Sequence, residues 1–180
     1  MHISVRRISN KLFSSGSVGR PVYLYKGQVE LMSAATVLTD LLVAHPLPEN
    51  LHIIPTTRDP ISHLALSSRN AFLSPSELRI APVLYHALSA ARETLLRGTL
   101  TTGEDTIASA CQVVLDQQES LKDDMSEVEL RMDYFEVFDQ NTFEPIRGEV
   151  QKGREMVVAG AVWVGRTRLI DNLLLGWEVG

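Results

Sequence analysis

The sequence predicts an α/β fold in two parts, a βαβ unit with parallel strands followed by a small α+β domain. Three observations support this prediction. Two short apolar runs flank an amphipathic segment near the N-terminus, a capped helical pattern begins after residue 73, and only Gly-Arg separates two β-prone runs near the C-terminus. We place the boundaries at 1–62, 63–72 and 73–180, with the middle segment acting as a loop or hinge.

The first part is predicted from the alternation of strand and helix patterns. Residues 21–25 are apolar and aromatic, and 29–43 carry apolar residues at helical intervals until the prolines of 45–50 end the helix. Residues 51–54 form a second short strand, which ends at Pro55. Strand, helix and strand at this spacing predict a parallel pair. Because two parallel strands leave both edges without partners, this part resembles the end of a larger sheet.

Two helices are predicted after residue 73. Ser74-Pro75-Ser76-Glu77 is a capping box with proline at the first helical position, and the helix should run to about Arg97, before Gly98. Its apolar stripe comprises Leu78, Ala81, Leu84, Leu88, Ala91 and Leu95. A second helix should begin near Thr102. Its predicted buried residues are Ile107, Cys111, Val114 and Leu115.

Three strands complete the predicted C-terminal domain. Val128, Leu130, Met132 and Tyr134 alternate with charged residues, which is typical of a half-buried strand. Residues 156–164 and 167–175 are both β-prone, and the Gly165-Arg166 turn between them predicts a hairpin. The domain should therefore contain two helices on a three-stranded antiparallel sheet.

Composition narrows the function classes. The chain has 180 residues and a formal net charge of -5, which argues against nucleic acid as a partner. Its longest apolar run is too short to cross a bilayer, so no membrane is expected. The single cysteine, Cys111, cannot form an internal disulfide and favours a reducing, cytoplasmic location. The basic, serine-containing residues 1–29 leave a mitochondrial transit peptide as the alternative.

Leu64-Ala65-Leu66-Ser67-Ser68-Arg69-Asn70 is the segment that most suggests chemistry. Two hydroxyls and a guanidinium in one short loop suit a group of anionic oxygens, and the planar arginine fork matches phosphate. A polar loop that caps the following helix is the structural alternative, because short motifs often match by chance. The surrounding sequence favours the first interpretation.

Residues 66–70 together with Leu73-Ser74-Pro75 resemble the signature of the pantoate–β-alanine ligase (pantothenate synthetase) family. Residues 54–59 resemble another segment of that family, as do Tyr134-Phe135-Glu136-Val137 with Asp139 and the stretch 167–172. Upstream the resemblance is patchy, although Lys11-Leu12-Phe13, Arg20 and Lys26 can be aligned without gaps.

The family's H-x-G-H motif does not occur in this sequence. The resemblance therefore identifies the chain as the C-terminal part of such an enzyme. Residues 1–62 would be a remnant of its Rossmann-like nucleotide-binding domain, and 63–72 would be the phosphate-binding loop.

The resemblance implies ATP-dependent adenylation of pantoate, followed by condensation with β-alanine to give pantothenate, AMP and pyrophosphate. ATP and Mg²⁺ would be the cofactors, no metal-ligating residue is assigned, and a homodimer is left open. Ser67 and Ser68 would bind phosphate oxygens while Arg69 counters their charge, and these three are the candidate catalytic residues. The candidate ATP-binding residues are Thr57, Leu66, Ser67, Ser68, Arg69 and Lys26.

Two hypotheses of different class remain open. The chain can be a ligase by family that is itself incomplete for catalysis, with little or no turnover when isolated. Alternatively, it is a non-catalytic nucleotide-binding or dimerisation module. For some polar residues the sequence also suggests structural roles without a part in binding or catalysis. Lys26 can be a solvated surface lysine, Arg58-Asp59 a local ion pair, and Asp171-Asn172 a hydrogen-bonding pair at a strand end.

Overall fold

The structure is a computed structural model. It describes Val22–Tyr25, Leu51–Ile54 and residues 56–97, 101–139, 144–150 and 153–176. The chain divides into two compact units, one formed by Met1–Pro55 with Glu178–Gly180 and the other by Thr56–Trp177.

The first unit contains a parallel pair of strands. Strand β1 is Val22–Tyr25 and strand β2 is Leu51–Ile54, with Val22 opposite Leu51 and Tyr25 opposite Ile54. Both strands and their parallel pairing confirm the sequence prediction. The helix predicted over 29–43 lies outside the described residues.

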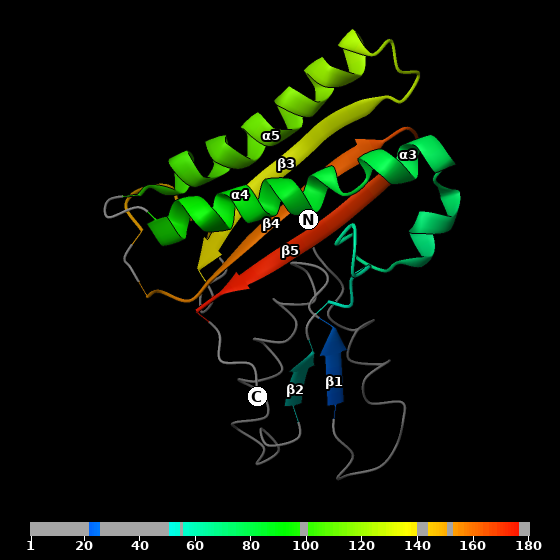
Figure 1. Ribbon diagram of the computed structural model, residues 1–180. Helices are drawn as coiled ribbons and strands as arrows, with labels where there is room; N and C mark the ends of the chain where they lie inside the picture. Colours follow the sequence, from blue (N-terminus) through cyan, green and yellow to red (C-terminus); the bar gives the residue numbers. More distant parts are fainter. Residues whose placement is uncertain are drawn as a thin grey trace. The chain divides into compact units, whose positions relative to one another are not determined.

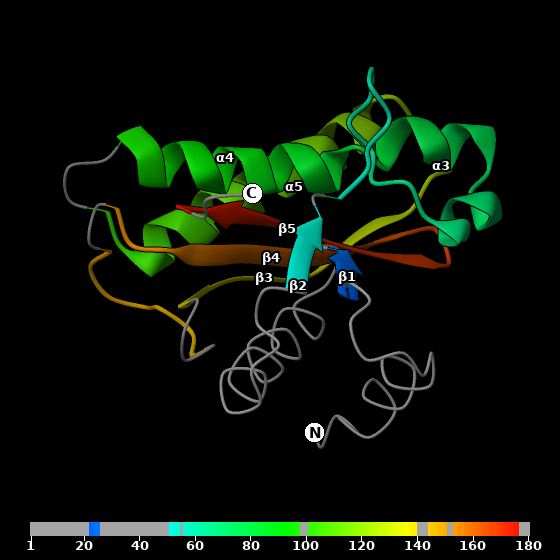
Figure 2. The same ribbon diagram turned by 90° about the horizontal axis from the view of Figure 1, so that it is seen from below.

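The second unit consists of helices on one face of an antiparallel sheet. Strands β3 (Leu130–Asp139), β4 (Met156–Val164) and β5 (Thr167–Leu175) follow one another in the order β3-β4-β5. Helices α4 (Val83–Arg97) and α5 (Gly103–Asp123) cover one face, with α5 against β3 and α4 against β4 and β5 (Figures 1 and 2). The α/β fold with a three-stranded antiparallel sheet is therefore as predicted.

The core lies between this sheet and these helices. Leu88 of α4 and Val114 of α5 are completely buried, as are Val137 of β3 and Val162 of β4. Gly160 of β4 leaves room for the ring of Phe135 on the neighbouring strand, because a Cβ at this position would occupy the ring's place. Burial of these side chains is the main source of stability in the unit.

The first predicted helix is in fact two helices. Helix α3 is Pro75–Ile80, begins with the predicted Ser74–Glu77 capping box, and is separated from α4 by Ala81 and Pro82. Proline lacks an N–H and its ring clashes with the preceding turn, so the helix breaks at that point. One consequence is that Leu78, predicted to lie in the buried stripe, is 39% exposed.

The second helix begins where the sequence predicts. Thr102 is the N-cap of α5, and its hydroxyl and the Asp105 carboxylate form a reciprocal capping box. Val114 is buried as predicted and Cys111 is half-buried against the core, but Leu115 is 46% exposed. None of the helices in the described ranges is long and apolar enough to cross a membrane.

Strand β3 departs from the simple alternation that the sequence predicts. Its register with β4 shifts between Met132 and Tyr134, which leaves Asp133 as the extra residue of a β-bulge. Beyond the bulge, Phe135 and Val137 point into the core, whereas Met132 is exposed. Because side chains alternate between faces, one inserted residue reverses the buried set.

The β4–β5 hairpin confirms the prediction closely. Val164 pairs with Thr167 across a turn of two residues, and Gly165 has the positive φ of 56° that suits the first position of such a turn. The Gly165 N–H donates to the Glu129 carbonyl oxygen at 2.7 Å, and the Glu77 side chain lies against Gly165. The hairpin turn is therefore fixed beside the start of α3.

Candidate functional site

Residues 57–72, here called the signature loop, contain five of the six predicted site residues. The Leu66 N–H donates to the Thr57 carbonyl oxygen at 2.9 Å, and Arg58 and Ala65 form an antiparallel bridge. These backbone contacts bring Thr57 next to Leu66, although they are separated in sequence. The sixth predicted residue, Lys26, lies outside the described residues.

Asp59 shapes the turn at the middle of the loop. Its carboxylate accepts hydrogen bonds from the N–H groups of Ile61 (3.1 Å) and Ser62 (2.7 Å) and from the Ser62 hydroxyl (2.8 Å). These donors, above all the Ser62 N–H, lower the pKa of Asp59 below its ordinary value of 3.8. The predicted ion pair between Arg58 and Asp59 is therefore wrong, since Asp59 is used within the turn.

Arg58 instead pairs with Asp171 on strand β5, 113 residues away in sequence. Both terminal nitrogens of Arg58 donate to the Asp171 carboxylate, and the Nη2–Oδ1 distance is 2.9 Å. The guanidinium also lies 4.7 Å from the ring centre of Tyr85 on α4, and His63 stacks on the same ring. This cluster fixes the start of the signature loop against β5 and α4.

The environment of Asp171 is almost fully closed to solvent. Its side chain is 3% exposed, and that of Arg58 is 15% exposed. Burial raises the pKa of Asp171, and the Arg58 guanidinium and the Asn172 N–H offset that effect only in part. Asp171 accepts the predicted hydrogen bond from Asn172, through its backbone N–H at 2.9 Å. The predicted strand-end position is wrong, because Asp171 lies in mid-strand and pairs with Arg58.

The Ser-Ser-Arg segment itself is exposed. Ser67 is the N-cap of a 3-10 helix, η2 (Ser68–Phe72), and its hydroxyl oxygen accepts a hydrogen bond from the Arg69 N–H at 3.2 Å. The Asn70 side chain donates to the Ala65 carbonyl oxygen at 3.0 Å and closes the loop from inside. Ser68 and Arg69 are exposed, and neither side chain has a hydrogen-bond partner among the described residues. Their donors are consequently available to a ligand.

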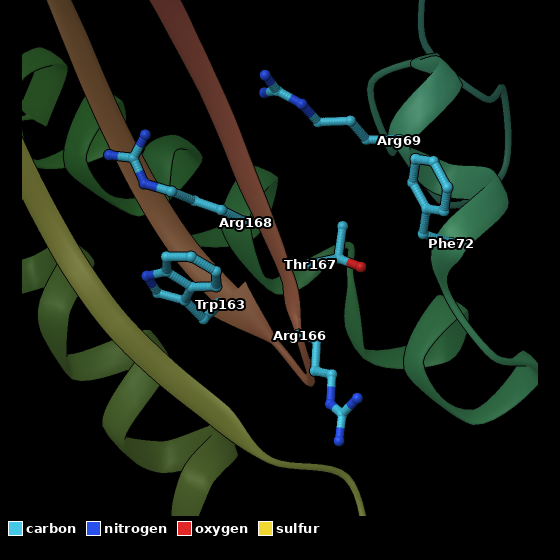
Figure 3. A pocket seen from close by; sticks show the side chains of 6 residues that line it. All are labelled: Arg69, Phe72, Trp163, Arg166, Thr167 and Arg168. Carbon is cyan, nitrogen blue, oxygen red and sulfur yellow. The ribbon is translucent and has the colours of Figure 1, made fainter.

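An open pocket of about 500 Å³ lies between η2 and the β4–β5 hairpin (Figure 3). Its lining residues are Arg69, Phe72, Trp163, Arg166, Thr167 and Arg168. The sequence interpretation identified only Arg69 among them. The closely spaced arginines of the hairpin were a signal that could have been noticed, but nothing local indicates that this turn meets the signature loop.

The described residues contain no group of three or more His, Cys, Asp or Glu side chains that could hold a metal ion. The arrangement is suited to binding anions through hydroxyl and guanidinium donors.

The sequence matches the family described as Pantoate-beta-alanine ligase over residues 3–174. The chain belongs to this family. A pantothenate synthetase from Coprothermobacter proteolyticus is 31% identical over 171 residues, which cover 93% of this chain and 53% of that protein. A second relative, from Koribacter versatilis, is also named pantothenate synthetase, and an enzyme of this name is a ligase.

Solved structures of the family share the fold. A pantothenate synthetase from Thermus thermophilus matches with a TM-score of 0.67 and 28% identity, covering 92% of this chain and 53% of that chain. A pantoate-beta-alanine ligase from Francisella tularensis, complexed with beta-gamma ATP and beta-alanine, matches with a TM-score of 0.51 and 18% identity. It covers 98% of this chain and 51% of its own. The chain spans about half the length of the relatives that it matches.

Proposed function

We propose that the chain serves the ATP-dependent ligation of pantoate to β-alanine, and that the signature loop binds ATP. The observation that carries this proposal is the exposed Ser67-Ser68-Arg69 segment at the edge of an arginine-lined pocket, in a chain of this family. Thr57 and Leu66 would contact the nucleotide from the neighbouring part of the loop, and Lys26 would supply a further cation.

In the first step, a carboxylate oxygen of pantoate attacks the α-phosphorus of ATP and the bond to pyrophosphate breaks, which leaves pantoyl adenylate. In the second step, the β-alanine amine attacks the acyl carbon, the bond to AMP breaks and the amine loses a proton. Negative charge builds on the phosphate oxygens during the first step. Hydroxyl donors at Ser67 and Ser68 and the guanidinium of Arg69 would stabilise that charge.

Calorimetric titration with ATP tests the assignment of the loop. Wild-type protein should bind ATP, and Arg69→Ala should weaken binding about tenfold, because a charge-assisted hydrogen bond is lost. Arg97→Ala is the matched control, since Arg97 is an exposed arginine that pairs with Glu93 on its own helix. Equal affinity of wild-type and Arg69→Ala proteins would show that the loop does not bind the nucleotide.

A second measurement separates the ligase from the non-catalytic module. AMP release that requires both pantoate and β-alanine supports the ligase reaction in this chain. ATP binding that depends on Arg69 without such release supports the nucleotide-binding module instead.

A further inference from the structure

The pocket beside the signature loop combines an unusual density of positive charge with two aromatic side chains. Three of its six lining residues are arginines, and none of the six carries a carboxylate. Among the described residues the Arg69 side chain has no hydrogen-bond or ion-pair partner, so its positive charge is available to a bound anion. The pocket is also large enough for several phosphate oxygens, since ligand sites of this kind begin at about 300 Å³.

Arg168 is held in place by a carboxylate outside the pocket. Its Nε donates to Asp133 Oδ2 at 2.6 Å, and Asp133 is the bulge residue of β3. This contact uses the Nε–H and leaves the terminal nitrogens for a ligand. Bulges commonly redirect a side chain next to a functional site, and here the bulge positions the partner that orients Arg168.

Residues of the sheet next to Arg168 contribute to the lining of the pocket. Trp163 of β4 lies opposite Arg168 of β5. The guanidinium of Arg131, on the other neighbouring strand β3, lies 5.4 Å from the centre of the Trp163 ring. Figure 3 shows Arg69 and Arg168 extending to the same side of the pocket, whereas Arg166 extends away from them. Because they extend to the same side, Arg69 and Arg168 are better placed than Arg166 to contact one anion.

We infer that Arg168 binds phosphate together with Arg69, and that this pocket receives the β- and γ-phosphates of ATP, which depart as pyrophosphate. The inference rests on the proposed function and extends it to a residue of the C-terminal hairpin. Two arginines from separate segments would then grip the leaving group, and preorganisation by Asp133 lowers the entropic cost of ordering Arg168.

Calorimetric titrations of the full chain with pyrophosphate, ATP and AMP test this inference. Arg168→Ala should weaken pyrophosphate and ATP binding about tenfold and leave AMP binding unchanged, because only the terminal phosphates are contacted. Arg168→Lys should recover part of the affinity, since it retains the charge but not the planar fork. Arg147→Ala is the matched control, because Arg147 is an exposed arginine that pairs with Glu136, and neither residue lines the pocket.

The possible outcomes are distinct. Unchanged pyrophosphate affinity in folded Arg168→Ala, together with weakened ATP binding in Arg69→Ala, overturns the inference and leaves the proposed function intact. Equal losses in Arg168→Ala and Arg147→Ala also overturn it, because the lower affinity would then follow from the loss of one positive charge anywhere on the chain. Pyrophosphate binding that depends on Arg168 in a protein that does not bind ATP supports the phosphate site and contradicts the proposed function.

Discussion

The signature loop and the helix–sheet layer of the second unit are stabilised in different ways. In the layer, side chains such as Leu88 and Val158 are shielded from water, whereas in the loop Leu66 is 60% exposed and Phe72 is 77% exposed. The loop is held by backbone hydrogen bonds, by the Asp59 turn and by the Arg58–Asp171 ion pair. Because its conformation does not depend on burying Ser67, Ser68 or Arg69, the loop can present these side chains to a ligand.

An ion pair between the two regions fixes the position of the signature loop on the sheet. Asp171 belongs to the sheet and Arg58 to the loop, so one ion pair joins a region stabilised by burial to one stabilised by hydrogen bonds.

The first prediction concerns the buried layer. Leu88→Ala should lower the free energy of unfolding by about 3 kcal/mol, because it removes a completely buried side chain and leaves a cavity. Leu96→Ala is the control on the same helix, and with its side chain 63% exposed it should change stability by less than about 0.5 kcal/mol. Chemical denaturation measures both values, and similar costs for the two variants would contradict the assigned core.

The second prediction concerns the link between the two regions. Arg58→Ala should cost about 2 kcal/mol, because it leaves the Asp171 carboxylate buried without its partner while Arg58 itself retains some solvent contact. It should also speed hydrogen exchange at the Leu66 N–H, which bonds to Thr57.

The control for this second prediction is Arg147→Ala. Arg147 pairs with Glu136 but is 53% exposed, so its removal should cost less than about 1 kcal/mol. If Arg58→Ala left both stability and exchange at Leu66 unchanged, the ion pair would not anchor the loop.

The third prediction concerns the loop alone. Ser67→Ala removes the N-cap acceptor of a short, exposed 3-10 helix and should cost only about 0.5 kcal/mol. Ser68→Ala should be neutral, because the Ser68 hydroxyl has no partner among the described residues. Thermal unfolding compares the two variants, and a large loss for either one would show that the loop contributes more to folding than its exposure suggests.

The fourth prediction uses pH. NMR titration should find the pKa of Asp59 below 3.8, where N–H donors favour the carboxylate, and that of Asp171 above 3.8, where burial favours the protonated acid. Asp59 therefore contributes stability that is present above pH 3.8 and is lost as the pH falls through its lower folded value. If the pKa values of Asp59 and Asp171 both lay above 3.8, or both below it, the contrast between the hydrogen-bonded loop and the buried layer would be contradicted.

Asp171 has the opposite dependence. Its contribution is fully present below pH 3.8 and is lost as the pH rises through its higher folded value, because the unfolded chain releases the proton first. Asp171→Asn should abolish that part of the pH dependence, which urea denaturation at a series of pH values would detect.

Much of the fold could be predicted from local patterns. The capping boxes at Ser74 and Thr102 and the Gly165-Arg166 turn place three element boundaries correctly, because each depends on hydrogen bonds within a few residues. The break at Pro82 was also readable, but the apolar spacing on either side concealed it. The bulge at Asp133 could not be predicted, because an inserted residue is recognised only when the partner strand is known.

The candidate site divides in the same way. The Ser-Ser-Arg segment was identified from the sequence because its chemistry is contained in three adjacent residues. The pairing of Arg58 with Asp171 and of Arg168 with Asp133 could not be identified from the sequence, because the partners are distant along the chain.

By itself, the sequence determined the order of the described strands and long helices, apart from the break at Pro82, and it contained the family signature and the polar Ser-Ser-Arg loop. The strands and helices follow from propensity, capping and periodicity, which act over a single turn or strand. Only the tertiary structure decided that Arg58 pairs with Asp171 and that Arg69 shares a pocket with Arg168. Such contacts depend on how strands pair and helices pack, and no local spacing encodes a meeting between residues 113 positions apart.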